Sequence, residues 1–165
     1  MIQELWEQIQ DGQEVRQNLS KIRQEIKDNG ERRKLSSLLE GKETVLINLL
    51  QSEDAKTRKN AALLMGDLRN PLFLAPIWKA YQEDGQRFVK SSYLSAIGNF
   101  DYREYMDAIK EQLAVLGKEK VTEENQKHVM EEMRKLSFLI VHIEGVSAHK
   151  FIGWDKAYDI FLITN

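Results

Sequence analysis

Apolar residues recur along the chain at the spacing of amphipathic helices. The clearest stripe advances in steps of four, three and four residues, at Val15, Leu19, Ile22 and Ile26. Because an α-helix turns once every 3.6 residues, such steps place the apolar side chains on one face. The pattern therefore predicts a helix that buries one side and exposes the other.

The same periodicity predicts a series of helices joined by short turns. Only two prolines and nine glycines interrupt the chain, and turn signals fall at Asp28–Gly30 and at Gly41. We expect helices over residues 2–9, 15–26, 35–39, 45–50, 54–71, 71–82, 87–100, 102–116 and 123–143. The prediction is an all-α fold.

Two of these helices resemble each other at a fixed offset of 32 residues. The segment AKTRKNAALLMGDL (55–68) aligns with RFVKSSYLSAIGNF (87–100), so that Gly66 lies opposite Gly98. The preceding helices keep the offset, with Val45 opposite Ile77. Self-similarity at this period is typical of stacked helical hairpins, in which neighbouring repeats share a core.

Gly66 raises a question, because glycine inside a helix costs about 1 kcal/mol relative to alanine. We interpret Gly66 as a residue whose small size lets one hairpin approach the next closely. The small residues Ala61, Ala62 and Gly98 have the same interpretation. Gly66 also helps to end the helix before Pro71. On this interpretation Gly66→Leu overpacks the contact, whereas Gly66→Ala has a mild effect.

The segments TRKNAALLMGDL (57–68) and VKSSYLSAIGNF (89–100) resemble the HEAT repeat family. The shared pattern is an apolar residue, a basic residue, a pair of small residues and then Leu-Gly-x-Leu. Thr57 and Tyr93 depart from it. The resemblance covers Glu43–Leu116 and implies a right-handed stack of helical hairpins that serves as a scaffold or binding surface, usually without catalysis.

In such a stack the second helix of each hairpin lines the concave face. We expect its exposed ridge to be a polar, adaptable surface with one aromatic residue, suited to a protein or peptide partner. The candidate binding residues are Lys56, Lys59, Asn60, Phe88, Ser91, Ser92 and Ser95.

The repeat-equivalent bases Arg58 and Lys90 have two interpretations. One is a structural ladder in which they pair with acids of neighbouring loops, with Asp54 four residues before Arg58. The other is a positive row that contacts phosphate. We favour the ladder, because acids balance exposed bases almost everywhere in the chain.

Charge gives little support to a nucleic-acid partner. The 165 residues carry a net charge of −2. In the most basic stretch, Lys21–Leu35, six bases face three acids, which indicates a solvated helical face more than a nucleic-acid patch. We therefore expect weak nucleic-acid binding by this chain alone, through Lys56, Lys59, Arg32 and Arg33 if at all.

Targeting signals and reactive cysteines are lacking in the sequence. There is no cysteine, the N-terminus lacks the basic and apolar segments of a signal peptide, and no apolar run is long enough for a membrane span. We expect a cytoplasmic protein with no membrane association.

Motifs for catalysis and cofactors are equally sparse. The sequence contains no phosphate-binding loop and no nucleotide-binding glycine fingerprint. His128, His142 and His149 form no metal-binding helical motif, so we expect no metal site and no cofactor. Relatives of the repeat class excise alkylated bases, but the required aromatic cleft and catalytic carboxylate are not recognisable. We assign no catalytic residue.

The C-terminal segment breaks the helical pattern. Residues 158–164 are aromatic and β-branched, which predicts a strand, Tyr158–Thr164. The segment 148–165 is similar to the region that leads into the catalytic domain of bacterial putative RNA methylases with N-terminal HEAT repeats.

We therefore expect a helical repeat domain over 1–143 and an extended tail over 144–165, at which a further domain begins if the chain is part of a larger protein. The predicted function is a non-catalytic scaffold or binding module. The alternative is a substrate-positioning domain of an S-adenosylmethionine-dependent RNA or DNA methyltransferase.

Overall fold

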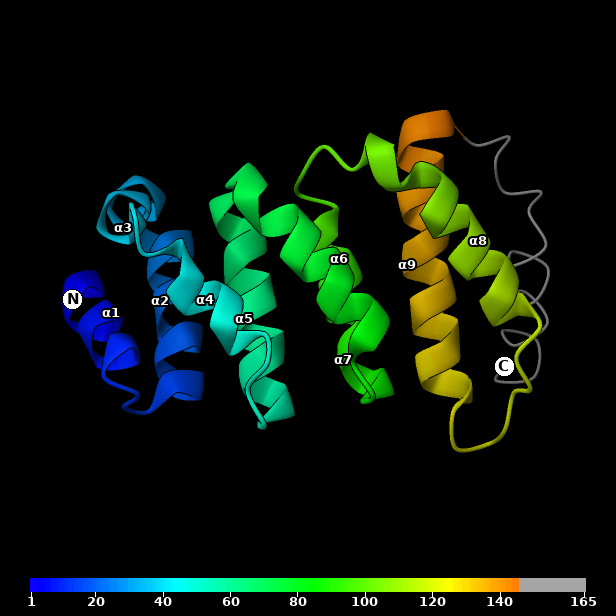
Figure 1. The fold of residues 1–165 in the computed structure, drawn as a ribbon, viewed down its shortest axis with the longest axis horizontal. Helices are drawn as coiled ribbons and strands as arrows, with labels where there is room; N and C mark the ends of the chain where they lie inside the picture. Colours follow the sequence, from blue (N-terminus) through cyan, green and yellow to red (C-terminus); the bar gives the residue numbers. More distant parts are fainter. Residues whose placement is uncertain (146–165) are drawn as a thin grey trace. The chain divides into compact units, whose positions relative to one another are not determined.

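The computed structural model describes residues 1–145, and every regular element in them is a helix (Figure 1). This confirms the all-α prediction for that part of the chain. The predicted strand Tyr158–Thr164 lies outside the described residues. The chain divides into two compact units, Met1–Phe100 and Asp101–Asn165.

The helices of the first unit follow the predicted series closely. They are α1 (Ile2–Gln10), α2 (Val15–Asn29), α3 (Arg32–Leu39), α4 (Glu43–Leu49), α5 (Ala55–Leu68), the 3-10 helix η1 (Pro71–Phe73), α6 (Leu74–Glu83) and α7 (Arg87–Ile97). The sequence did not distinguish the 3-10 turn η1 from the α-helix that follows it, since both have similar side-chain periods over three residues.

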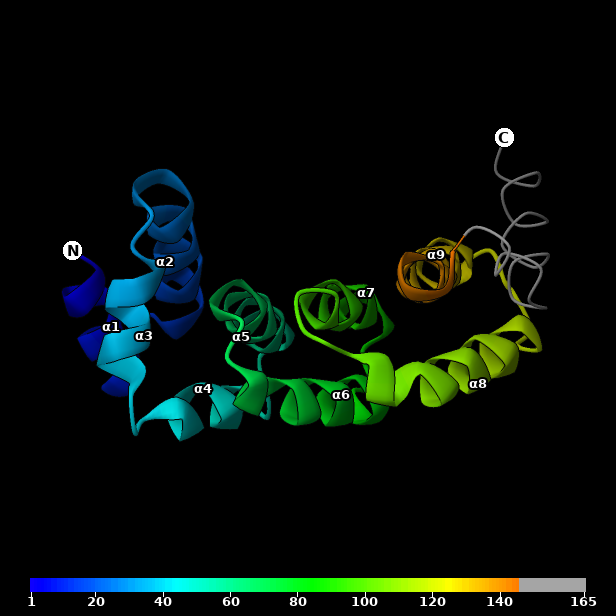
Figure 2. The same ribbon diagram turned by 90° about the horizontal axis from the view of Figure 1, so that it is seen from above.

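Within the first unit, α5 and α7 lie side by side in one layer, and α4 and α6 form a second layer against them (Figure 2). Helix α2 packs on the other side of α5. It runs parallel to α5, because Arg16 near its start lies beside Asp54 while Arg23 further on pairs with Asp67. The second helices α2, α5 and α7 thus form one layer, which we call the inner layer.

The core of the first unit lies between these two layers. Helices α5 and α7 contribute buried side chains to it, among them Thr57, Ala61, Leu64, Met65, Leu68, Val89, Tyr93, Ala96 and Ile97. Phe100, which follows α7, is half-buried. Helices α4 and α6 contribute Leu46, Ile77, Trp78 and Tyr81. The apolar stripes predicted from the sequence are therefore the packed faces.

Gly66 is a contact residue between two hairpins. A Cβ atom placed on it would lie 2.9 Å from the Cα of Ala96 and 3.0 Å from its Cβ. Because the nearest atom belongs to the backbone of α7, the space cannot be made by a side-chain rotation. The expectation that alanine is mild at this position is therefore wrong. Gly98, by contrast, is exposed and caps the end of α7.

The 32-residue period is visible in the helix starts. Helices α5 and α7 begin at Ala55 and Arg87, 32 residues apart. The 3-10 turns η1 and η2, each continuous with an α-helix, begin at Pro71 and Arg103, again 32 residues apart. The period therefore continues into the segment that follows the two aligned copies.

The second unit contains η2 (Arg103–Tyr105), α8 (Met106–Gly117) and α9 (Gln126–Glu144), and α8 packs along α9. The hydroxyl of Tyr102 donates a 2.7 Å hydrogen bond to the carbonyl of Leu139, which joins the start of this unit to α9. Among the described residues, no helix has both the length and the apolar character that crossing a bilayer requires.

Candidate functional site

The predicted binding residues lie on two adjacent helices of the inner layer. Lys56, Lys59 and Asn60 are on α5, and Phe88, Ser91, Ser92 and Ser95 are on α7. Lys56 and Phe88 are exposed and the others are half-buried. The structure therefore brings the two groups to one layer.

Two of these residues, Asn60 and Phe88, have properties that the others in the set do not share. The side-chain amide of Asn60 donates to the backbone carbonyl of Arg16 at 3.2 Å, so Asn60 helps join α5 to α2. Phe88 is 39% exposed, although a phenyl ring gains from burial. Partner surfaces are enriched in aromatic residues, so Phe88 is the member of the set best suited to contact a protein.

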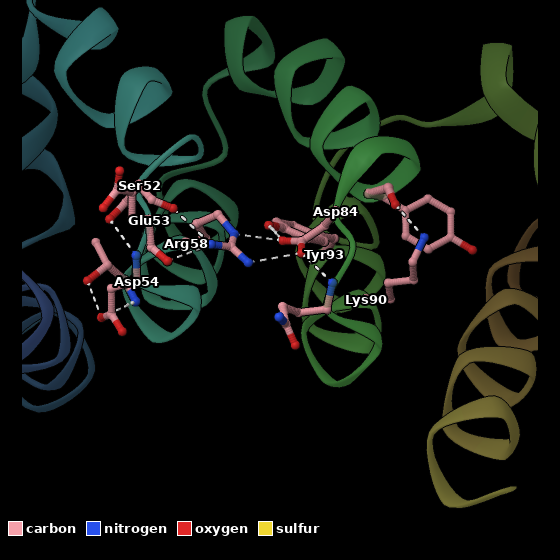
Figure 3. Close-up of polar contacts among 10 residues, drawn as sticks. Ser52, Glu53, Asp54, Arg58, Asp84, Lys90 and Tyr93 are labelled. Atoms are coloured by element: carbon pink, nitrogen blue, oxygen red, sulfur yellow. Dashed lines mark hydrogen bonds and ion pairs between the residues drawn. The ribbon is translucent and has the colours of Figure 1, made fainter. Parts of the chain in front are cut away.

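Arg58 is the centre of a polar network between hairpins (Figure 3). Its Nε and Nη2 donate to the two carboxylate oxygens of Asp84 at 2.8 and 3.0 Å. Its Nη1 donates to the carbonyls of Ser52 and Glu53 at 2.8 and 3.3 Å. Arg58 thus ties the loop before its own helix to the loop before α7.

The acidic partner Asp84 is nearly enclosed, with 3% of its side chain exposed. Burial alone disfavours its charged form, but hydrogen bonds from Arg58, from the Tyr93 hydroxyl at 2.5 Å and from the backbone amide of Gln86 together hold its pKa below the usual 3.8. Burial and the bond to Asp84 raise the pKa of Tyr93. The network therefore contains an ionised carboxylate and a neutral phenol.

Asp54 and Lys90 lie beside this network and have other roles (Figure 3). Asp54 accepts hydrogen bonds from the backbone amide and hydroxyl of Thr57 at 3.1 and 2.7 Å, so it caps α5 instead of pairing with Arg58. Lys90 donates to the carbonyl of Tyr81 at 3.0 Å, and its Nζ lies 5.0 Å from the centre of the Tyr81 ring. Lys90 thus binds a carbonyl near the end of α6, whereas Arg58 binds carbonyls of the loop that follows α4.

Sequence reasoning did not identify Asp84 and Tyr93 as members of this network. Asp84 lies in the loop between α6 and α7, and the ladder interpretation of the basic residues pointed to acids in such loops. The repeat alignment and a search of the next loop for an acid would have found it. Nothing in the sequence places the Tyr93 hydroxyl on that carboxylate.

The chemistry of this network is that of a structural clamp. Arg58 uses its Nε and both Nη atoms on protein acceptors, and a carboxylate held ionised by an arginine is a weak general acid or base at neutral pH. In the described part of the chain, no group of three or more His, Asp or Glu side chains is placed to hold a metal ion.

Comparisons of the chain with protein-family models, with curated proteins and with solved structures give no match.

Proposed function

We propose that this protein is a non-catalytic binding module built as a right-handed, HEAT-like stack of helical hairpins, and that a protein or peptide partner docks on the inner layer. The observation that carries the proposal is the clamp formed by Arg58, Asp84 and Tyr93. It uses charged, nearly enclosed groups to fix one hairpin against the next, which favours a rigid frame over a reactive site.

The docking surface of the proposal is the ridge of α5 and α7. It combines half-buried serines, which adapt their hydrogen bonds to a partner, with the exposed ring of Phe88. A rigid frame lowers the conformational cost of association, because the surface is already ordered. Phe88 is the expected anchor of the contact.

Site-specific photo-crosslinking tests the proposal. A photoreactive amino acid is placed at Phe88 or Ser92 on α7, and at Gln82 on α6 as an exposed control outside the inner layer. We expect one protein to be captured from positions 88 and 92 and not from 82. With that protein purified, Phe88→Ala should weaken binding by about tenfold, since truncating a central aromatic typically costs more than 1 kcal/mol.

Two results would contradict the proposal. One is the absence of any discrete crosslink from the inner layer, and the other is equal capture from Gln82. The methyltransferase alternative depends on residues 148–165, outside the described part, and no observation on the described residues favours it.

A further inference from the structure

A basic cleft lies between α2 and α5, away from the ridge that carries Phe88. It has a volume of about 610 Å³, within the range of about 300–1,000 Å³ that is usual for ligand sites. Among the described residues, its lining includes four basic side chains and a single acidic one: Arg23, Lys27, Arg32, Arg69 and Asp67.

One of these bases is neutralised and three are not. Arg23 pairs with Asp67 through Nε at 2.6 Å and Nη2 at 3.4 Å. Among the described residues, Lys27, Arg32 and Arg69 have no carboxylate partner within ion-pair distance, and all three are exposed. The cleft therefore presents three positive charges with no acid of its own to balance them.

At two of these positions, 32 and 69, an arginine is unfavourable for the local helix or backbone conformation. Arg32 lies in the first turn of α3, which has no acid, so its charge faces the positive end of the helix dipole. Arg69 has a φ of 57°, a left-handed conformation that glycine adopts at lower cost. Lys27, near the end of α2, is the one base of the three that the dipole favours.

We propose that this cleft binds a short acidic segment of a partner protein, whose carboxylates pair with Lys27, Arg32 and Arg69. Arginine binds carboxylates through two parallel hydrogen bonds, which gives the pairing a defined geometry. The inference rests on the proposed role as a binding module and adds the chemistry of a second contact.

An acidic peptide fits this cleft better than a nucleic acid does. Nucleic-acid affinity grows with the number of phosphates neutralised along a strand, whereas three bases in one cleft neutralise few. None of the described residues that line the cleft is aromatic and able to stack on bases.

Fluorescence anisotropy with a labelled peptide of four alternating glutamate–glycine pairs tests the proposal on the full chain. We expect saturable binding that weakens between 50 and 300 mM salt. Arg32→Gln and Arg69→Gly should each weaken it roughly twofold to fivefold, the effect of losing one exposed charge pair. Lys79→Gln, which removes an exposed charge from α6, should leave it unchanged.

Thermal unfolding of the same variants separates binding from folding. Arg69→Gly should unfold at the same or a higher temperature than the wild type, because glycine relieves the left-handed backbone. A variant that is at least as stable and yet binds less peptide supports a ligand site.

Three outcomes would overturn the proposal: no saturable binding of the glutamate peptide, equal weakening by Lys79→Gln, or tighter binding of a single-stranded RNA oligomer that competes for Arg32 and Arg69. None of these depends on the crosslinking from Phe88, so failure of the cleft and failure of the proposed docking surface are distinguishable.

Discussion

At the scale of single residues, α5 faces the backbone of α7 with a residue that has no side chain. The missing Cβ of Gly66 lets α5 approach the backbone of Ala96, and any larger residue must move one helix away from the other. The close packing of α5 on α7 therefore depends on glycine at position 66.

We predict that Gly66→Ala destabilises the protein although alanine improves helix propensity by about 1 kcal/mol. Overpacking typically costs about 1–3 kcal/mol, and Gly66→Leu should cost more than Gly66→Ala. The matched control is Gly85→Ala, where an added Cβ meets nothing within 4 Å. Thermal unfolding checks the order; a Gly66→Ala variant as stable as Gly85→Ala would contradict the contact.

Asp84 gives a prediction about pH. Its pKa is lower in the folded protein than its usual 3.8, so its contribution to stability is present at neutral pH and is lost as the pH falls through the folded pKa. We expect Asp84→Asn to reduce the free energy of unfolding at pH 7 by about 1.5–3 kcal/mol, the cost of losing hydrogen bonds to a charged group.

The difference in stability between wild type and Asp84→Asn should shrink below about pH 4, since protonated aspartic acid and asparagine are both neutral. Tyr93→Phe, which removes one of the hydrogen bonds to Asp84, should keep part of the wild-type pH dependence, because Arg58 and the backbone amide of Gln86 still hold the carboxylate ionised. Urea unfolding at pH 7, 5 and 3 measures this. A difference that is constant across that range would show that Asp84 is not held ionised.

At the scale of elements, Asp54 is an N-cap whose loss should weaken α5. We predict that Asp54→Ala lowers the free energy of unfolding by about 1 kcal/mol and that Asp54→Asn has little effect, because asparagine also accepts the capping bond from Thr57. If the ion pair with Arg16 at 3.8 Å mattered more, Asp54→Asn would be as damaging as Asp54→Ala. Chemical denaturation of the two variants distinguishes the cases.

Most elements were predictable from local pattern, and the contacts between them were not. Stripes such as Val15, Leu19 and Ile22, with glycine at the turns, specify helices without reference to the rest of the chain. The pairing of Arg58 with Asp84 depends on how far one hairpin is displaced along the next, which is a property of packing. For the same reason the sequence suggested that Gly66 contacts the next hairpin, but it did not show that a Cβ atom there would clash with the backbone of Ala96.

At the scale of the whole molecule, the sequence predicted a helical domain over 1–143, whereas the structure separates units at Phe100 and Asp101. The junction has no run of glycine, proline or serine that would signal a boundary. The distinction comes from tertiary contacts, which are concentrated within each unit. Both units contain buried apolar residues, such as Leu64, Ile77 and Ile97 in the first and Ile109 and Leu136 in the second.

This division predicts that residues 1–100 fold on their own. The fragment keeps both layers of the first unit, the Gly66–Ala96 contact and the whole clamp around Asp84. We expect helical circular dichroism, one cooperative thermal transition and dispersed amide signals in NMR spectra.

A shorter fragment, 1–83, is the matched control. It lacks Asp84 and α7, so Arg58 loses its carboxylate partner and the packed side of α5 is exposed to water. We expect it to lose the cooperative transition, because uncovering that apolar surface removes the main stabilising term of the layer. If 1–100 melts without cooperativity, or if 1–83 folds equally well, then the first unit is not held together by the packing of α5 on α7.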